Sequence, residues 1–356
     1  MIPETVDERR YAIFAEGWFS SRHAKTAHGL IRYGKDEVVA VIDSTLADRS
    51  VREVMPELVP EPERDAPIVG SLGEALEYSP TSVLVGLAPA GGRLPEEWLD
   101  ALRQAAGAGL EIVSGLHQRL GDEFPGAKVW DVREPPEEVP LFSGEACGVQ
   151  QKVALTVGTA NAIGKMTATL EVQRAASEAG VSSEFVATGQ TGIVIAGWGI
   201  SVDAVVSDFV AGASEQLVLE AARRGPEVIL VEGQGSLGHP AYSGVTLGLL
   251  HGSCPDCLVL CADASREEVV AGVPRPAPAR VARLYEEVAS LVKPAPVVAV
   301  SANTRGLDDA EAAEFVARLS DETGLPAADP FRGSAAPILE AVLEAPKTRP
   351  VGARPW

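Results

Sequence analysis

At residues 157–167 the chain reads VGTANAIGKMT, a glycine-bounded loop placed between a strand signal and a helix signal. The apolar run Val153 to Val157 precedes the loop, and a helical pattern over Met166 to Ala179 follows it. Strand, glycine-containing loop and helix in this order are the context in which a phosphate-binding loop forms. Gly158 and Gly164 lack a Cβ, so the backbone there is free to direct its N–H groups toward an anion. The segment therefore predicts a phosphate cradle.

The side chains of this loop indicate how a phosphorylated ligand is held. Lys165 supplies a mobile cation at the positive N-terminal end of the predicted helix. Five residues separate the two glycines instead of the usual four, and Met166 stands where a Ser or Thr normally holds Mg²⁺. Thr167 follows one place later and is the predicted metal ligand if Mg²⁺ is used. The alternative is an ordinary strand-to-helix turn with a solvated lysine. The predicted cofactor-binding residues of this loop are Gly158, Thr159, Asn161, Gly164, Lys165, Met166 and Thr167.

Length and composition limit the classes of protein that fit this sequence. A chain of 356 residues suggests two domains. Acidic residues outnumber basic ones, 50 against 30, for a formal charge of −20. Such a charge disfavours nucleic acid and anionic membranes, so we expect a small-molecule partner held in a local pocket. No apolar run is long enough to span a bilayer, and residues 1–10 lack a signal-peptide core, so we expect a cytoplasmic protein.

Residues 1–138 are predicted to form a Rossmann-like domain. Apolar strands over 11–15 and 38–42 alternate with helical patterns, which favours a parallel sheet covered on both faces. The glycine fingerprint of dinucleotide binding is missing, and bulky Trp18 stands after the first strand where a pyrophosphate would pass. Asp43 closes the second strand, where a ribose partner would lie. For Asp43 we expect the simpler role of a strand-end cap.

Residues 139–356 are predicted to form a P-loop NTPase-like domain, which begins after a linker rich in proline and charge at 131–140. The predicted fold class is therefore α/β, with a Rossmann-like parallel sheet followed by a P-loop NTPase-like parallel sheet. A long helix is expected from Asp203 to Arg223, with Asp203 as its N-cap. Further strands are expected over 184–187, 228–231, 257–261 and 296–300.

An acidic residue closes the predicted strand over 228–231. Downstream of a P-loop this is the position that holds Mg²⁺ or its water, so Glu232 is predicted as a metal ligand or a general base. A helix-capping carboxylate is the alternative. His239 lies in the same loop, and histidine is the side-chain type most often used as a general base, which makes a general base and a structural histidine about equally expected. Lys165, Glu232 and His239 form the predicted catalytic set.

Polar loops close the other strands of this half. The segment ATGQTG at 187–192 frames hydroxyls and an amide with glycines, which suits recognition of a carboxylate or phosphate oxygen. Asn303 closes a late strand, a position that contacts the nucleobase in many P-loop proteins, and we expect it to bind the cofactor. The predicted substrate-binding residues are Thr188, Gly189, Gln190, Thr191, Asp203 and Gln234.

The four cysteines are too few for a disulfide scaffold in a chain of this length. Cys254, Cys257 and Cys261 lie close together in the sequence, just after His251, and a structural zinc is one interpretation. Cys261, however, ends an apolar run that is typical of a buried strand. We therefore expect small buried hydrophobic side chains in place of metal ligands.

Several segments carry a resemblance to a known family. They are GTANAIGKMT (158–167), ATGQTG (187–192), VDAVVSDFVAG (202–212), VEGQGSLGHPAYSGVTLGLLHG (231–252), AKTAHGLIRYG (24–34) and SGLHQRL (114–120). The chain resembles a widespread family of unknown function that has a Rossmann-like amino-terminal half and a P-loop carboxyl-terminal half. Within it, the sequence is most similar to the D-glutamate N-acetyltransferases. This resemblance implies acetyl-CoA as co-substrate, an acidic amino acid as acceptor, and a homo-oligomer.

The P-loop half also resembles dethiobiotin synthetase, through its GT…GK loop, the EG.G segment at 232–235 and Asn303. That likeness implies ATP and Mg²⁺. The chain departs from its family at Ala160-Asn161, where an acid and a cysteine usually stand. We expect first an N-acetyltransferase acting from acetyl-CoA on a D-glutamate-like amino acid. An ATP- and Mg²⁺-dependent kinase or amide ligase is the second expectation, and a non-catalytic nucleotide sensor is the third.

Overall fold

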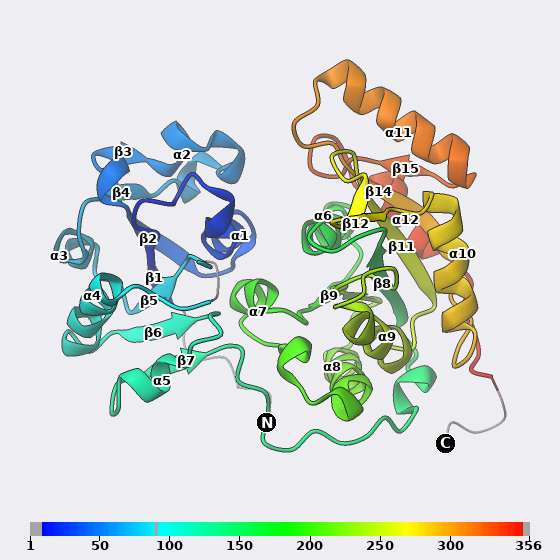
Figure 1. Ribbon diagram of the computed structural model, residues 1–356, viewed down its shortest axis with the longest axis horizontal. Helices are drawn as coiled ribbons and strands as arrows, with labels where there is room; N and C mark the ends of the chain where they lie inside the picture. The colour runs from blue at the N-terminus through cyan, green and yellow to red at the C-terminus, as the bar shows by residue number, and fades with distance from the viewer. Residues whose placement is uncertain (1–8, 90–91, 352–356) are drawn as a thin grey trace. The chain divides into compact units, whose positions relative to one another are not determined.

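The computed structural model of the protein describes residues 9–89 and 92–351 and divides the chain into two compact units (Figure 1). The first unit comprises Met1–Pro136 and Gly189–Ser201, and the second comprises Glu137–Thr188 and Val202–Trp356. Each unit packs helices against a mainly parallel sheet, which confirms the predicted fold class. No helix in the described ranges is both long and apolar enough to cross a bilayer.

The first unit is built on a seven-stranded sheet in the order β3-β4-β2-β1-β5-β6-β7. Neighbouring strands are parallel except β3 and β4, which pair antiparallel at the edge. The central strands are almost entirely buried, as expected of a parallel sheet with both faces covered. The strands are β1 (Arg10–Phe14), β2 (Glu37–Ile42), β3 (Arg49–Ser50), β4 (Pro67–Val69), β5 (Ser82–Val85), β6 (Glu111–Ser114) and β7 (Val129–Asp131).

One helix of the first unit comes from the carboxyl-terminal half of the chain. Helix α7 (Gln190–Ala196) packs against α1, where the hydroxyls of Thr191 and Thr26 lie 3.1 Å apart. A Cβ placed on Gly29 of α1 would lie 2.9 Å from the Thr191 side chain, so the glycine permits this close approach. The predicted domain boundary between residues 138 and 139 does not account for the segment Gly189–Ser201, which belongs to the first unit. The helices of the unit are α1 (Lys25–Tyr33), α2 (Val51–Val54), α3 (Leu72–Ala75), α4 (Glu96–Gly107), α5 (Leu120–Glu123) and α7.

Asp43 and Trp18 follow the central strands of this sheet, where a dinucleotide would approach. Asp43 is fully buried and caps the short helix Ser44–Leu46. Its carboxylate accepts hydrogen bonds from the Thr45 N–H at 3.0 Å and the Thr45 hydroxyl at 2.6 Å. Trp18 packs edge-on against Trp98, with ring centroids 5.6 Å apart. The predicted capping role of Asp43 is confirmed, and its carboxylate is engaged by the protein itself.

The second unit is built on a six-stranded parallel sheet in the order β15-β14-β11-β8-β10-β9. Strand β8 lies near the centre of the sheet. After β8 the chain forms the edge strand β9 and then returns to form β10, which lies between β8 and β9. Loops at the carboxyl ends of such central strands are where parallel α/β sheets bind their ligands. The strands are β8 (Lys152–Gly158), β9 (Ser183–Val186), β10 (Val228–Val231), β11 (Cys257–Asp263), β14 (Val297–Asn303) and β15 (Ala327–Ala328).

Helices cover this sheet, and a separate hairpin joins β12 (Glu268–Val270) to β13 (Val273–Pro274) (Figure 1). Helices α6 and α12 share one apolar core with the sheet, which includes Val172, Leu230 and Ile338. The helices of the unit are α6 (Lys165–Glu178), α8 (Val210–Arg223), α9 (Ser243–Gly252), α10 (Pro278–Ala289), α11 (Asp309–Thr323) and α12 (Ala336–Glu344).

The expected helix from Asp203 to Arg223 is wrong at its start. Residues Val202–Ala204 form a 3-10 turn in which Asp203 is exposed, and α8 begins only at Val210. The predicted N-cap role of Asp203 is wrong for the same reason. Val206 is exposed and Ser207–Phe209 form a second 3-10 turn, so the apolar residues upstream of α8 do not belong to a buried helical face.

The cysteines differ from the prediction in one respect. Cys147 and Cys254 form a disulfide with a Cα–Cα distance of 4.9 Å, which joins residues 107 positions apart. The interpretation of Cys254 as a small buried hydrophobic side chain is therefore wrong. Cys257 and Cys261 carry buried free thiols in β11, as predicted. The partner of Cys254 lies outside its cysteine cluster, so local spacing did not reveal the bond.

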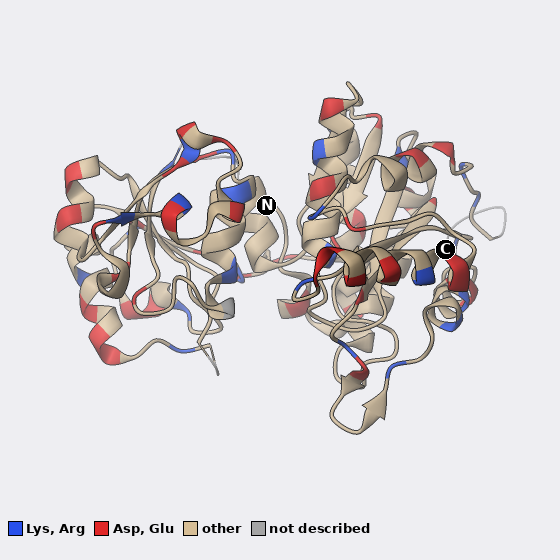
Figure 2. Cartoon of the chain, turned by 90° about the horizontal axis from the view of Figure 1, so that it is seen from above, with Lys and Arg blue, Asp and Glu red and all other residues tan. Residues whose placement is uncertain are grey.

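The acidic excess of the composition is distributed over both units. Acidic residues lie on the helices of each unit (Figure 2). In two helices the acidic residues lie in the first turn. These are Glu96 and Glu97 in α4, and Asp309 and Glu311 in α11. Carboxylates at these positions interact favourably with the positive end of a helix. A phosphorylated ligand therefore needs a local arrangement of donors to overcome the overall charge.

Candidate functional site

The loop between β8 and α6 has the geometry of an anion-binding nest. Ala162 and Gly164 have φ angles of +51° and +100°, and this left-handed backbone turns the loop back on itself. The backbone N–H groups of residues 161–167 have no hydrogen-bond acceptor anywhere in the described ranges 9–89 and 92–351. Helix α6 begins at Lys165, directly behind these amides, and adds its positive end. A phosphate group matches this set of donors.

Lys165 is the cation of this loop and lies inside it. Its Nζ donates a hydrogen bond to the carbonyl oxygen of Ala160 at 3.0 Å. A Cβ placed on Gly158 would lie 3.1 Å from the same Nζ, so a side chain at position 158 would crowd the ammonium group. Burial lowers the pKa of Lys165 to about 8, while Cys261 and Glu232 act in the opposite direction. An anionic ligand would favour the protonated form.

The loop after β10 brings a buried carboxylate to the same place. Glu232 accepts a hydrogen bond from the N–H of Thr188 at 3.0 Å, and its own carbonyl accepts one from the Thr188 hydroxyl at 2.8 Å. Gly233 then passes directly over β8, because a Cβ on it would lie 1.7 Å from the carbonyl oxygen of Thr156. The Gly233 N–H donates to the Thr156 hydroxyl at 2.9 Å. The structure therefore brings Glu232 and Lys165 together.

The predicted substrate-binding residues are divided between the two units. Thr188 and Gln234 belong to the second unit, where the Gln234 amide donates to the Thr188 hydroxyl at 3.3 Å. Residues 189–191 belong to the first unit, where Gln190 accepts a hydrogen bond from Arg133 at 3.0 Å. The motif therefore spans the point, between Thr188 and Gly189, where the chain passes from the second unit to the first. It also carries polar side chains. Only its first two residues, Ala187 and Thr188, lie in the unit that carries the P-loop.

His239 is held by its own loop. Its Nδ1 accepts a hydrogen bond from the N–H of Ala241 at 3.2 Å, and its ring stacks on Tyr242 with centroids 4.5 Å apart. A neutral histidine that accepts at Nδ1 carries its proton on Nε2. In this arrangement His239 is a hydrogen-bond donor, and the geometry does not favour the predicted general base.

Asn303 braces the P-loop. Its side-chain amide donates to the carbonyl oxygen of Ile163 at 3.2 Å and to the carboxylate of Asp263 at 2.8 Å. Its carbonyl oxygen accepts from the N–H of Arg305 at 3.2 Å. Both amide hydrogens are engaged, so the geometry supports a role in holding the cradle rather than in reading a nucleobase.

Tyr285 of α10 is a residue that the sequence analysis missed. Its fully buried hydroxyl donates to the carbonyl oxygen of Gly158 at 3.1 Å and accepts from the N–H of Leu237 at 3.1 Å. Burial raises the pKa of this phenol, so it stays protonated. Tyr285 thereby joins the end of β8 to the loop after β10. Tyr285 lies on the buried, apolar face of its helix, and this pattern by itself does not distinguish it from an ordinary core residue.

Thr167 and Glu232 are the predicted ligands for Mg²⁺. Thr167 lies half-buried in the first turn of α6, and Glu232 closes β10 at the same edge of the sheet. Over residues 9–89 and 92–351, no cluster of three or more His, Cys, Asp or Glu side chains suits a metal ion. An Mg²⁺ ion at this edge would therefore need water and nucleotide phosphate oxygens to complete its coordination.

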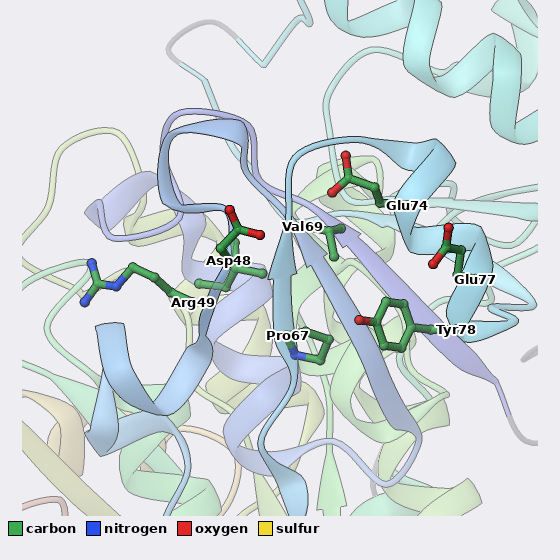
Figure 3. A pocket seen from close by; sticks show the side chains of 8 residues that line it. Asp48, Arg49, Pro67, Val69, Glu74, Glu77 and Tyr78 are labelled. Carbon is green, nitrogen blue, oxygen red and sulfur yellow. The ribbon is translucent and has the colours of Figure 1, made fainter.

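The first unit contains a pocket of about 300 Å³ beside its edge strand β3 and the neighbouring strand β4 (Figure 3). Its lining includes the carboxylates of Asp48, Glu74 and Glu77, against one cation, Arg49. The Glu74 carboxylate also accepts hydrogen bonds from the backbone of Gly70 and the hydroxyl of its helix cap. A pocket with this charge disfavours a phosphorylated ligand, so the P-loop of the second unit remains the candidate site.

Comparisons with known proteins agree with this architecture. The DUF1611 P-loop domain, a domain of unknown function, matches residues 140–339, and the Rossmann-like domain of the same family matches residues 45–135. A crystal structure of a DUF1611 family protein from Anabaena variabilis is 40% identical and superposes with a TM-score of 0.87. The superposition covers 95% of this chain and 100% of that one.

Two relatives carry a functional name. A D-glutamate N-acetyltransferase from Tritonibacter scottomollicae is 36% identical over 286 residues, which cover 76% of this chain and 84% of that protein. A D-glutamate N-acetyltransferase from a Pseudoalteromonas species is 37% identical over 273 residues, 74% of this chain and 81% of that protein. Models of the two DUF1611 domains thus match both halves of the chain, which confirms the resemblance seen in the sequence. The chain belongs to the DUF1611 family.

Proposed function

We propose that the protein is an N-acetyltransferase that moves an acetyl group from acetyl-CoA to the amino group of an acidic amino acid such as D-glutamate. The observation that carries the proposal is the set of free N–H groups over residues 161–167, with Lys165 beside them. These donors fit the phosphates of the CoA moiety. The names of the relatives support the acetyl transfer and the acceptor.

The reaction joins the acceptor nitrogen to the acetyl carbon. The free amine attacks the thioester carbonyl, the new C–N bond forms, the C–S bond breaks, and the nitrogen loses a proton as CoA leaves. The pantetheine arm of CoA separates this thioester from the phosphates. The charge of Glu232 acts to raise the pKa of Lys165, so we place both residues at the phosphate end of the donor. Glu232 therefore positions Lys165 and Thr188 and is not the general base of this proposal.

An ATP- and Mg²⁺-dependent kinase or amide ligase is the second candidate. It is favoured by Glu232 at the end of β10, where P-loop proteins hold Mg²⁺ or its water, and by Thr167, one place after the usual Ser or Thr position in the first turn of α6. In that case the phosphates on residues 161–167 belong to ATP. Phosphoryl transfer would then take place at this edge of the sheet.

One assay separates the two candidates. Acetyl-CoA and D-glutamate are incubated with the protein without nucleotide, and free CoA thiol is measured together with N-acetylglutamate by mass spectrometry. Equimolar thiol and N-acetyl product supports acetyl transfer, with L-glutamate and an acceptor-free sample as controls. Product or ADP that forms only after ATP and Mg²⁺ are added assigns the second candidate in place of the first.

A further inference from the structure

A second pocket of the first unit, of about 380 Å³, lies among the loops that follow the neighbouring parallel strands β5 and β6. Loops at the carboxyl ends of such strands are where parallel α/β sheets bind ligands, and pockets for small molecules begin at about 300 Å³. The pocket opens to solvent, because most of its lining side chains are exposed. It includes part of the segment 114–120, to which the proposed function gives no role. The lining residues are Arg93, His117, Gln118, Arg119, Asp122 and Glu123.

Gln118 joins the two loops and fixes the shape of this pocket. Its backbone N–H donates to the carbonyl oxygen of Gly92 at 3.1 Å, and its side-chain oxygen accepts from the N–H of Leu94 at 2.9 Å. Arg93 lies between these two anchored residues, and His117 directly precedes Gln118. A Cβ placed on Gly92 would lie 2.7 Å from His117 Cδ2, so the imidazole packs closely over that glycine. The two loops therefore bring Arg93 and His117 to one pocket.

Some charged groups of the lining are paired within the protein, and others are not. Arg119 donates to the carboxylate of Glu134 at 2.8 Å, and the Glu123 carboxylate accepts from the Gln118 amide at 3.1 Å. Within residues 9–89 and 92–351, the lining side chains that make no hydrogen bond or ion pair are those of Arg93, His117 and Asp122. The pocket therefore offers two free donors and one free carboxylate.

This set of groups matches an amino acid. A guanidinium group and an imidazole N–H suit a carboxylate, and a free carboxylate suits an ammonium group. Two arginines balance two carboxylates in the lining, so an anionic ligand meets less repulsion there than the formal charge of −20 suggests. The pocket beside β3 and β4 lacks this balance, because three carboxylates there face Arg49 alone.

We propose that this pocket binds an acidic amino acid, with one carboxylate on Arg93 and His117 and the ammonium group on Asp122. The second carboxylate lies toward Arg119, whose exposed ion pair with Glu134 contributes little and can be exchanged. The site itself goes beyond the proposed function, whereas the choice of D-glutamate as its ligand rests on that function.

The experiment compares D-glutamate with glutarate, the same dicarboxylate without an amino group. Calorimetry on the full chain measures each compound with and without CoA, so that an ordered reaction does not hide the site. Arg93→Gln removes the charged donor and is expected to weaken both compounds about tenfold. Asp122→Asn is expected to weaken D-glutamate about fivefold and to leave glutarate unchanged or tighter, because only D-glutamate carries the ammonium group.

A matched control and the acetyl-transfer assay complete the test. Arg49→Gln changes an exposed arginine of the other pocket and should bind like the wild type. Wild-type affinity for D-glutamate in both pocket variants, or no binding to the wild type under either condition, would overturn the pocket even if acetyl transfer occurs. An equal loss of both compounds in Asp122→Asn would contradict the ammonium contact. D-glutamate that binds and weakens as expected, in a protein that forms no N-acetyl product, would instead keep the pocket and remove the proposed function.

Discussion

The Nζ of Lys165 donates a hydrogen bond to the carbonyl oxygen of Ala160 at 3.0 Å, so the P-loop lysine lies across its own loop. This contact gives the ammonium group one acceptor, while the amides of residues 161–167 have no acceptor in the described ranges. A phosphate offers the lysine a charged acceptor in exchange for a neutral one, and hydrogen bonds between charged groups are stronger. The loop therefore holds its cation ready for an anion.

Removal of the Lys165 charge should remove phosphate binding without unfolding the protein. Lys165→Met keeps the buried stem and deletes the ammonium group, so we expect dephospho-CoA to bind about 100-fold more weakly. Calorimetry measures this loss, and a thermal melt monitors the fold. Lys35→Met, at an exposed lysine of the first unit, is the matched control. Retained affinity in Lys165→Met would remove the lysine from the site.

The pKa of Lys165 predicts the pH dependence of binding. Burial lowers it to about 8, so the free protein carries the ammonium below that pH and loses it above. Affinity for dephospho-CoA, whose diphosphate does not titrate in this range, should be constant near pH 7. It should fall up to about tenfold by pH 9, one pH unit above the pKa. Calorimetry across this range should show the slope in the wild type and a flat profile in Lys165→Met. A slope that persists in the variant would come from another group.

The brace formed by Asn303 should matter more for binding than for folding. Asn303→Ala deletes the hydrogen bonds to Ile163 and Asp263, so the carbonyl at position 163 loses its anchor and the nest loosens. We expect dephospho-CoA affinity to fall about tenfold and the free energy of unfolding by about 1 kcal/mol. A urea titration measures the second quantity. Unchanged affinity alongside a loss of stability would make Asn303 purely structural.

The contact of Gly233 with β8 should not tolerate any side chain. Gly233→Ala places a Cβ 1.7 Å from the Thr156 carbonyl oxygen, so backbone must move, and we expect a loss of more than about 2 kcal/mol in the free energy of unfolding. Gly244→Ala is the control, because that glycine lies in α9 with open space around it. Alanine there should be neutral or stabilising by up to about 1 kcal/mol. Similar melting temperatures for the two variants would contradict the close approach.

The disulfide between Cys147 and Cys254 should be measurable by thiol counting. Two thiols are expected to react in the denatured, non-reduced chain, those of Cys257 and Cys261, and four after reduction. A cross-link over 107 residues restricts the unfolded chain, so reduction should lower the melting temperature by the equivalent of about 4 kcal/mol. The Cys147→Ser, Cys254→Ser double variant should be insensitive to reductant. Four reactive thiols before reduction would rule the bond out.

The parts of the site that depend on local sequence were predictable. The nest over residues 161–167 follows from a strand, glycines and a helix that are contiguous in the chain, and α6 begins within one residue of the predicted start at Met166. Glu232 was identified because it closes an apolar strand. Both signals arise from short-range periodicity, which a single sequence displays directly.

The parts that depend on tertiary contacts were not predictable. The sequence around Tyr285 indicates a buried helical face, but it does not reveal that the hydroxyl forms hydrogen bonds with Gly158 and Leu237. Helix α7 belongs with the first unit because of its packing on α1, which its sequence position does not suggest. Asp203 was misplaced because the apolar period upstream of Val210 continues through turns. For Tyr285 and for α7, a partner distant in sequence fixes the outcome.

The central claim is that the amides of residues 161–167 hold the phosphates of the donor. A crystal structure of the protein with CoA tests it most directly, through the positions of the phosphate oxygens. We predict a phosphate of CoA within hydrogen-bond distance of several of these N–H groups and of Lys165 Nζ. CoA bound elsewhere, with Lys165 still on Ala160 and the amides facing no anion, would contradict the account.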